Sequence, residues 1–122
     1  MSIEEFYLSV GGSFTDVSKR LPTLGMVEKY IKKFAADLSY SQLCEAFNNG
    51  DMSAAFMAAH TLKGVAGNLG FGNLFRSSSA VTEALRGNDN PDIAQCRLLL
   101  DAVIADYDAL MNASEKYFSA KN

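Results

Sequence analysis

The chain has 122 residues, nearly half of them hydrophobic and a fifth charged, and its formal net charge is −3. This length is enough to bury a core in one domain, and the composition is that of a globular protein. The sequence contains no block of basic residues, which excludes a nucleic-acid interface. Its longest apolar stretches are far shorter than the about 20 residues that a membrane span needs.

The N-terminus and the cysteines indicate the compartment. The first residues, MSIEE, lack the basic and apolar regions of a secretory signal. Cys44 and Cys96 lie far apart and form no CxxC pair, so we expect two free thiols in a reducing environment. The sequence therefore predicts a cytoplasmic protein that neither crosses nor binds a membrane.

Helical periodicity begins near the N-terminus. A cap at Ser13 predicts a short helix that ends before Pro22. Thr23 is expected to cap a second helix, and its apolar residues recur at three- and four-residue steps: Val27, Tyr30, Ile31, Phe34 and Leu38. We expect residues 39–41 to interrupt this helix, which then resumes through Leu43 and Phe47 and stops at residues 48–50.

The next helix has the clearest boundaries. Asp51 is a suitable N-cap for a helix from about Met52 to Leu69. Gly70 is well placed to end this helix in a left-handed conformation. The sequence therefore predicts a helix of about five turns in the middle of the chain.

The rest of the chain completes the predicted fold. A further helix is expected to stop at Gly87. Asn90 and Pro91 form a pair typical of a helix start, and the last helix is expected to run to about Phe118. No alternating β-branched run indicates a strand. We predict one all-α domain over residues 1–122: an antiparallel up-down four-helix bundle, its core at about 24–118, with a short extra N-terminal helix.

The single histidine lies on the helix that follows Asp51. One broad side of this helix is apolar, with Ala55, Ala58, Ala59, Leu62, Val65, Ala66 and Leu69. At roughly 100° per residue, His60 points nearly the opposite way. Lys63, Gly64 and Gly67 follow it on the same side, and Phe56 and Met57 precede it by one turn. We therefore expect an exposed imidazole beside a cation.

The two glycines stand inside a helix, where each costs about 1 kcal/mol relative to alanine. One interpretation is that Gly64 and Gly67 leave space for a bulky partner to approach His60. The other is that they permit close packing of a neighbouring helix. The sequence leaves both open for either glycine.

The stretch AHTLKGVAGNLG, residues 59–70, resembles the signature of histidine-containing phosphotransfer (Hpt) domains, which carry H-x-L-K-G and a glycine at the helix end. Gly50 and Asp51 before this helix, and the upstream helix with Phe34, also resemble the family. Phe71 differs from the small residue usual at its position, and Val81-Thr82 differ from the common Leu-Glu pair.

The resemblance implies a phosphotransfer intermediate of a two-component phosphorelay. His60 would accept a phosphoryl group from the aspartate of a receiver domain and pass it to another receiver. Lys63 would balance the charge of the phosphate, and Gly64 and Gly67 would admit the receiver. Phe56 and Met57 would form an apolar docking patch, although bundle packing remains an equal interpretation for both.

The implied partners are receiver domains of response regulators or of a hybrid sensor histidine kinase. The receiver would bring Mg²⁺, so the chain would need no cofactor or metal of its own and would work as a monomer.

Other functions lack the residues that they require. A di-iron bundle needs two Glu-x-x-His motifs, and this chain has one histidine, with Met57 in place of the glutamate. HExxH, GxSxG and a P-loop are absent, so no independent hydrolase or kinase activity is expected. The remaining alternative is a non-catalytic helical adaptor that binds a signalling partner through the face around His60.

Overall fold

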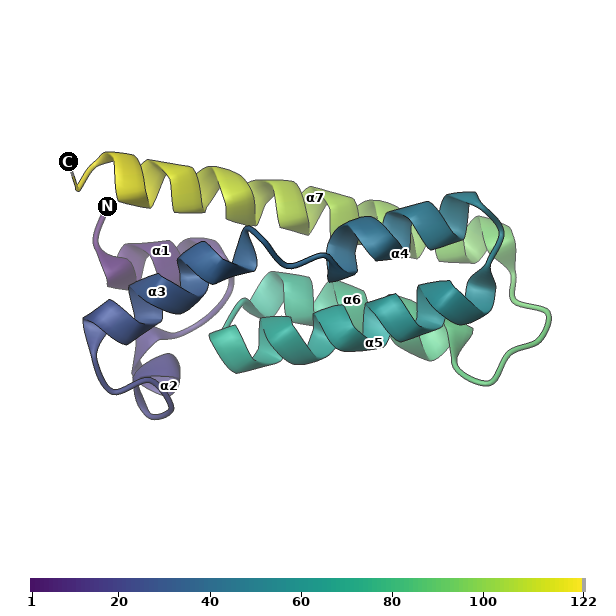
Figure 1. Ribbon diagram of the computed structural model, residues 1–122, viewed down its shortest axis with the longest axis horizontal. Helices are drawn as coiled ribbons and strands as arrows, with labels where there is room; N and C mark the ends of the chain where they lie inside the picture. The colour runs from purple at the N-terminus through teal and green to yellow at the C-terminus, as the bar shows by residue number, and fades with distance from the viewer. Residues whose placement is uncertain (122) are drawn as a thin grey trace.

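A computed structural model describes residues 1–121 and shows helices joined by short loops (Figure 1). The helices are α1 (Ile3–Ser9), α2 (Phe14–Ser18), α3 (Leu24–Phe34), α4 (Ser39–Asn48), α5 (Met52–Leu69), α6 (Gly72–Leu85) and α7 (Ile93–Ser119). No strand occurs in this part of the chain. The all-α prediction is confirmed. No helix within the described residues has both the length and the apolar character needed to cross a membrane.

The helices α4, α5, α6 and α7 run up and down beside one another as an antiparallel bundle (Figure 1). Helix α7 runs along the whole molecule, and α3 lies in line with α4 on the same side. The short helices α1 and α2 lie at the end of the bundle that also holds both termini. The predicted bundle is therefore present, with an additional helical cluster at one end.

The core explains how α5 is held. Its buried residues are mostly alanines, at positions 55, 58, 59 and 66, with Leu62 and Leu69 between them. Short side chains let α4 and α6 pack closely against α5 on either side. Of the predicted apolar side, only Val65 is half-buried rather than buried. The opposite side of α5 faces solvent.

The caps read from the sequence are largely confirmed. The side chains of Ser13, Thr23 and Asp51 accept hydrogen bonds from the backbone three residues on. Gly70 ends α5 with a φ of +76°, a backbone conformation that favours glycine because it has no Cβ. These caps fix where α5 begins and ends.

Helix α1 was not predicted. Ser2 and Glu5 form a reciprocal capping box at its start, and Ile3, Phe6 and Tyr7 of this helix are buried. The S-x-x-E pattern before an apolar run is a known sign of a helix start. The signal was therefore present in the sequence.

Two predicted boundaries were wrong. Residues 39–41 belong to α4, and the break falls at residues 35–38, where Asp37 Oδ1 accepts a hydrogen bond from the Ser39 backbone at 2.9 Å. Leu38, expected on the apolar face, is 64% exposed. Helix α7 starts at Ile93 and not at the Asn90-Pro91 pair, because the Asp92 side chain caps it by accepting from Gln95 N at 3.1 Å.

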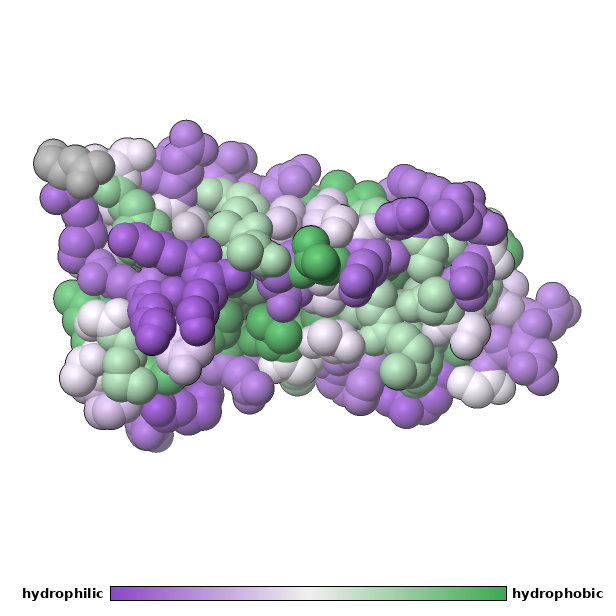
Figure 2. All heavy atoms as spheres, viewed as in Figure 1, coloured by the Kyte–Doolittle hydropathy of each residue, from purple (hydrophilic) through white to green (hydrophobic). Residues whose placement is uncertain are grey.

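The surface of the molecule is uneven in polarity. Figure 2 shows a hydrophilic region over α3, the helix that carries the exposed Lys29, Lys32 and Lys33. Paler and apolar residues alternate with hydrophilic ones over α4 and α5. Cys44 is half-buried and Cys96 buried, and both are free thiols, as expected.

Candidate functional site

His60 lies at the middle of α5 and is exposed to solvent. Its neighbours Ala58, Ala59 and Leu62 point into the core. Because α5 is fixed by caps at both ends and by packing on its apolar side, its backbone cannot rotate His60 inward. The predicted exposure of the imidazole is confirmed.

The aromatic ring of Phe56 lies beside the imidazole. The two ring centres are 6.0 Å apart and the planes differ by 10°. Phe56 is half-buried and packs against the core. Its ring therefore lies between the core and His60. The structure therefore brings together two of the predicted site residues from successive turns of α5.

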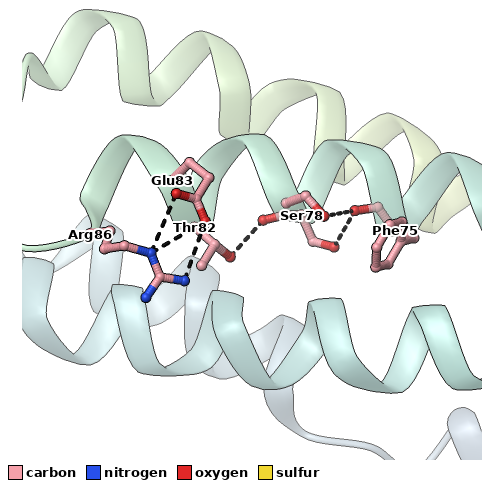
Figure 3. A network of polar contacts seen from close by, with 6 residues as sticks. Phe75, Ser78, Thr82, Glu83 and Arg86 are labelled. Carbon is pink, nitrogen blue, oxygen red and sulfur yellow. Dashed lines mark hydrogen bonds and ion pairs between the residues drawn. The ribbon is translucent and has the colours of Figure 1, made fainter.

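Helix α6 contributes a residue that sequence reasoning missed. The guanidinium of Arg86, at the C-terminal end of α6, lies 5.3 Å from the centre of the Phe56 ring. Glu83 holds Arg86 in place through an ion pair of 3.2 Å (Figure 3). The hydroxyls of Ser78 and Thr82 donate to backbone carbonyls within α6, so these buried polar groups have their hydrogen-bond partners within their own helix.

The two glycines differ in their surroundings. A Cβ on Gly64 would meet nothing within 4 Å, whereas a Cβ on Gly67 would lie 3.0 Å from Cδ1 of Phe75 on α6. The helix-packing interpretation is therefore wrong for Gly64 and correct for Gly67, which accommodates the Phe75 ring. Gly64 leaves open space one turn beyond His60.

Lys63 is half-buried and is the only formally charged residue of α5. Within residues 1–121 it forms no ion pair with an acidic side chain. Its ammonium group is therefore not neutralised by a carboxylate in this part of the chain. An anion bound near His60 would find a cation one turn away.

Met57 lies on the other flank of His60. Its side chain is 60% exposed and borders a shallow hollow between α4 and α5, together with Ala58 and Thr61. Phe56 and Met57 thus place apolar surface on two sides of the imidazole. Such a surface, with one nucleophile and one cation, suits the docking of a protein better than the enclosure of a small molecule.

Among the described residues no group of three or more His, Cys, Asp and Glu side chains lies close enough to hold a metal ion. The chemical resources of this face are therefore an imidazole, an ammonium group, apolar side chains and open backbone at Gly64. An imidazole nitrogen can form a bond to phosphorus, and a nearby ammonium group favours the charged product.

Comparison with known proteins supports this chemistry. Neither the curated proteins nor the solved structures include a match to this chain. A family model described as the Hpt domain matches residues 25–113. Hpt domains carry histidine phosphotransfer in phosphorelays, and they interact with receiver domains of two-component systems. Because the match covers most of the 122 residues, the chain belongs to the Hpt domain family.

Proposed function

We propose that His60 accepts a phosphoryl group from the phosphorylated aspartate of one receiver domain and passes it to the aspartate of another. The observation that carries this proposal is the setting of the single histidine: an exposed imidazole on a rigid helix, with open space at Gly64 directly beyond it. The open backbone is what a partner of protein size needs to bring its own reactive group to the ring.

The transfer involves one bond formed and one broken. The lone pair of Nε2 attacks the phosphorus, the bond from phosphorus to the aspartyl oxygen breaks, and the aspartate leaves as a carboxylate. In the second step a different receiver's carboxylate attacks, and the electrons of the N–P bond return to the ring. His60 is therefore regenerated and supplies a nucleophile without a net change.

The neighbouring residues have supporting roles in this proposal. The ammonium group of Lys63 stabilises the dianionic phosphohistidine, an effect of about 1 kcal/mol for a solvent-accessible pair. Gly64 admits the loops around the receiver's aspartate, whereas Gly67 accommodates the Phe75 ring. Phe56 and Met57 supply apolar contact on the two flanks. The receiver contributes Mg²⁺ and an acidic pocket, so catalysis depends on positioning and charge neutralisation by the partner.

The test is transfer of labelled phosphate. A receiver domain is phosphorylated with radiolabelled acetyl phosphate, purified and mixed with this protein. We expect acid-labile, base-stable label on the wild type and none on His60→Gln. Circular dichroism and urea unfolding establish that the variant keeps its fold. Label on His60→Gln, or no label on the wild type with any receiver of the source organism, would contradict the proposal.

The same experiment separates phosphotransfer from the adaptor alternative. An adaptor binds receivers through this face but takes no phosphate. We expect His60→Gln to bind the unphosphorylated receiver with little change in Kd, since the substitution keeps a polar side chain of similar size. Wild-type protein that binds a receiver and never carries label would favour the adaptor.

A further inference from the structure

The N-terminal segment closes the end of the helix that carries His60. The Tyr7 hydroxyl donates to Leu69 O at 3.0 Å. The guanidinium of Arg20 donates from Nε and Nη2 to Asn68 O at 3.2 and 3.1 Å, and from Nη2 to Gly67 O at 3.4 Å. The last carbonyls of a helix have no partner within the helix. Two such carbonyls of α5, Asn68 O and Leu69 O, are therefore satisfied by residues that precede the Hpt match, whereas Gly67 O also accepts from Gly70 N at 3.3 Å.

Close backbone contact holds this segment on the bundle. A Cβ on Gly12 would lie 2.0 Å from Gly70 O, and one on Gly72 would lie 2.0 Å from Gly11 O. No side chain fits at Gly12 or Gly72 without displacing backbone. The α1–α2 connection and the α5–α6 connection therefore touch directly, which fixes Arg20 relative to α5.

Arg20 is at once anchored and exposed. Nε and Nη2 are bonded to α5, while Nη1 donates no hydrogen bond within residues 1–121. The side chain stands between two hollows at the end of α5. One is bordered by Gly67 and Phe75, the other by Tyr30 and Val65. The guanidinium thus presents an oriented donor at the C-terminal end of the helix that carries His60.

The end of α5 that Arg20 contacts is close enough to His60 for one docked domain to cover both. Eight residues separate His60 from Asn68, which is about 12 Å along a helix. A typical interface covers about 800 Å² on each partner, which corresponds to a disc of about 16 Å radius. A receiver centred on His60 therefore extends over Arg20.

Helices α5 and α6 and the residues between and after them carry a net charge opposite in sign to that of the whole chain. Residues 52–86 contain three basic residues, Lys63, Arg76 and Arg86, and one acidic residue, Glu83, whereas the whole chain carries −3. Arg20 adds a further cation at the end of α5, where the exposed Asp16 borders the same hollow. A partner surface with exposed carboxylates complements these cations.

We propose that Arg20 is a docking residue for the receiver, in which Nη1 donates to a carboxylate on the part of the receiver's surface that extends beyond its reactive aspartate and over the end of α5. This inference rests on the proposed function. It assigns to the segment before the family match a part of partner recognition as well as the closure of α5. Because three hydrogen bonds already orient the guanidinium, little further side-chain entropy is lost when the partner binds.

The test compares two ways of disturbing the same helix end. Phosphoryl transfer to His60 is followed with the full chain and the labelled receiver that reacts fastest with the wild type. We expect Arg20→Gln to raise KM about tenfold and to leave kcat within about twofold, and to weaken the salt dependence of KM. Tyr7→Phe removes a buried cap from the same helix end but cannot touch a partner, so we expect an unchanged KM.

A second control isolates the effect of charge alone. Lys19 is the neighbouring cation on the same segment, is exposed and pairs with Asp16 at 3.8 Å. We expect Lys19→Gln to change KM less than twofold. The inference fails if Arg20→Gln raises KM no more than Tyr7→Phe or Lys19→Gln does, or if it lowers kcat alone. In each of these outcomes label still reaches His60 in the wild type, so the proposed function stands.

Discussion

The ring of Phe56 lies nearly parallel to the imidazole of His60, with ring centres 6.0 Å apart. Phe56 itself is fixed between the core and the guanidinium of Arg86, 5.3 Å from its ring centre. A side chain that would otherwise sample several rotamers therefore has an aromatic surface on one side. The arrangement favours a ring that is accessible at its edge, where both nitrogens lie.

This relationship predicts a spectroscopic signature. Phe56→Leu keeps an apolar side chain at the position but removes the aromatic ring current from His60. Because the chain has one histidine, the two imidazole C–H resonances are unambiguous in a proton NMR spectrum. We expect both to move downfield in the variant. Leu98→Ala, at an exposed position of α7, is the control and should leave them in place; identical spectra for Phe56→Leu and wild type would refute the stacking.

We expect the substitution of Gly64 to raise the stability of the fold and to slow phosphoryl transfer. Gly64→Ala removes a poor helix former at a site where a Cβ meets nothing within 4 Å. We expect the free energy of unfolding in urea to rise by about 1 kcal/mol. The same methyl group occupies the space beside His60, so we expect the rate of phosphoryl transfer to fall at least tenfold. A variant that is more stable and equally fast would show that Gly64 is not an access point.

Gly67→Ala provides the matched comparison. Its Cβ would lie 3.0 Å from Phe75 Cδ1, so the ring, 38% exposed, must shift by a few tenths of an ångström. We expect part of the gain in helix propensity to be offset, and the free energy of unfolding to rise by less than in Gly64→Ala. An equal or larger rise would mean that Phe75 moves without cost.

The difference between these two glycines also shows where sequence reasoning ends. The period of the apolar residues on α5 is a local property, so it predicted correctly that Ala59 and Leu62 are buried and His60 exposed. Whether a glycine is open or filled depends on a side chain from another helix. Phe75 reaches Gly67, and Arg86 reaches Phe56, only because α6 packs against α5 at one particular register.

The helix boundaries were likewise predicted correctly where their signals are local. Asp51 and Gly70 bound α5 as predicted, since their capping interactions are local. The end of the α3 segment was misplaced because the exposed Leu38 continues the apolar period beyond the last helical turn. Arg20 was not identified because its carbonyl partners lie 47 and 48 residues away. Nothing in the sequence near Arg20 indicates that contact.

The C-terminal end of α7 predicts a pH dependence of stability. Hydrogen bonds from Lys121 and from the Tyr117 hydroxyl hold the pKa of the Glu28 carboxyl below its usual value. A carboxyl with a lowered pKa in the folded state stabilises the fold above its unfolded pKa of about 4.3. This contribution is lost as the pH falls through the lower folded pKa.

We therefore expect Glu28→Gln to reduce the free energy of unfolding by about 1 kcal/mol at pH 7. At a pH below both pKa values the wild type and the variant should unfold at nearly the same urea concentration. Glu115→Gln, at an exposed position of α7, serves as control and should differ little from wild type at either pH. A gap between Glu28→Gln and wild type that is equally large in acid would assign the effect to packing and not to charge.

We expect the charge of Lys63 to affect the equilibrium fraction of this protein that is phosphorylated. Removing its charge in Lys63→Gln should shift the equilibrium between phosphoreceiver and phosphorylated His60 toward the receiver by about fivefold, which corresponds to about 1 kcal/mol for an accessible cation beside a phosphate. The shift should shrink in 1 M salt, where the Debye length falls to about 3 Å. The shift is measured by quantifying the label on both proteins at equilibrium.

Lys116→Gln, which replaces an exposed cation on α7, causes the same loss of net charge and should leave the equilibrium unchanged. If both variants shift it equally, the effect belongs to the net charge of the protein and not to the position of Lys63 one turn from the imidazole.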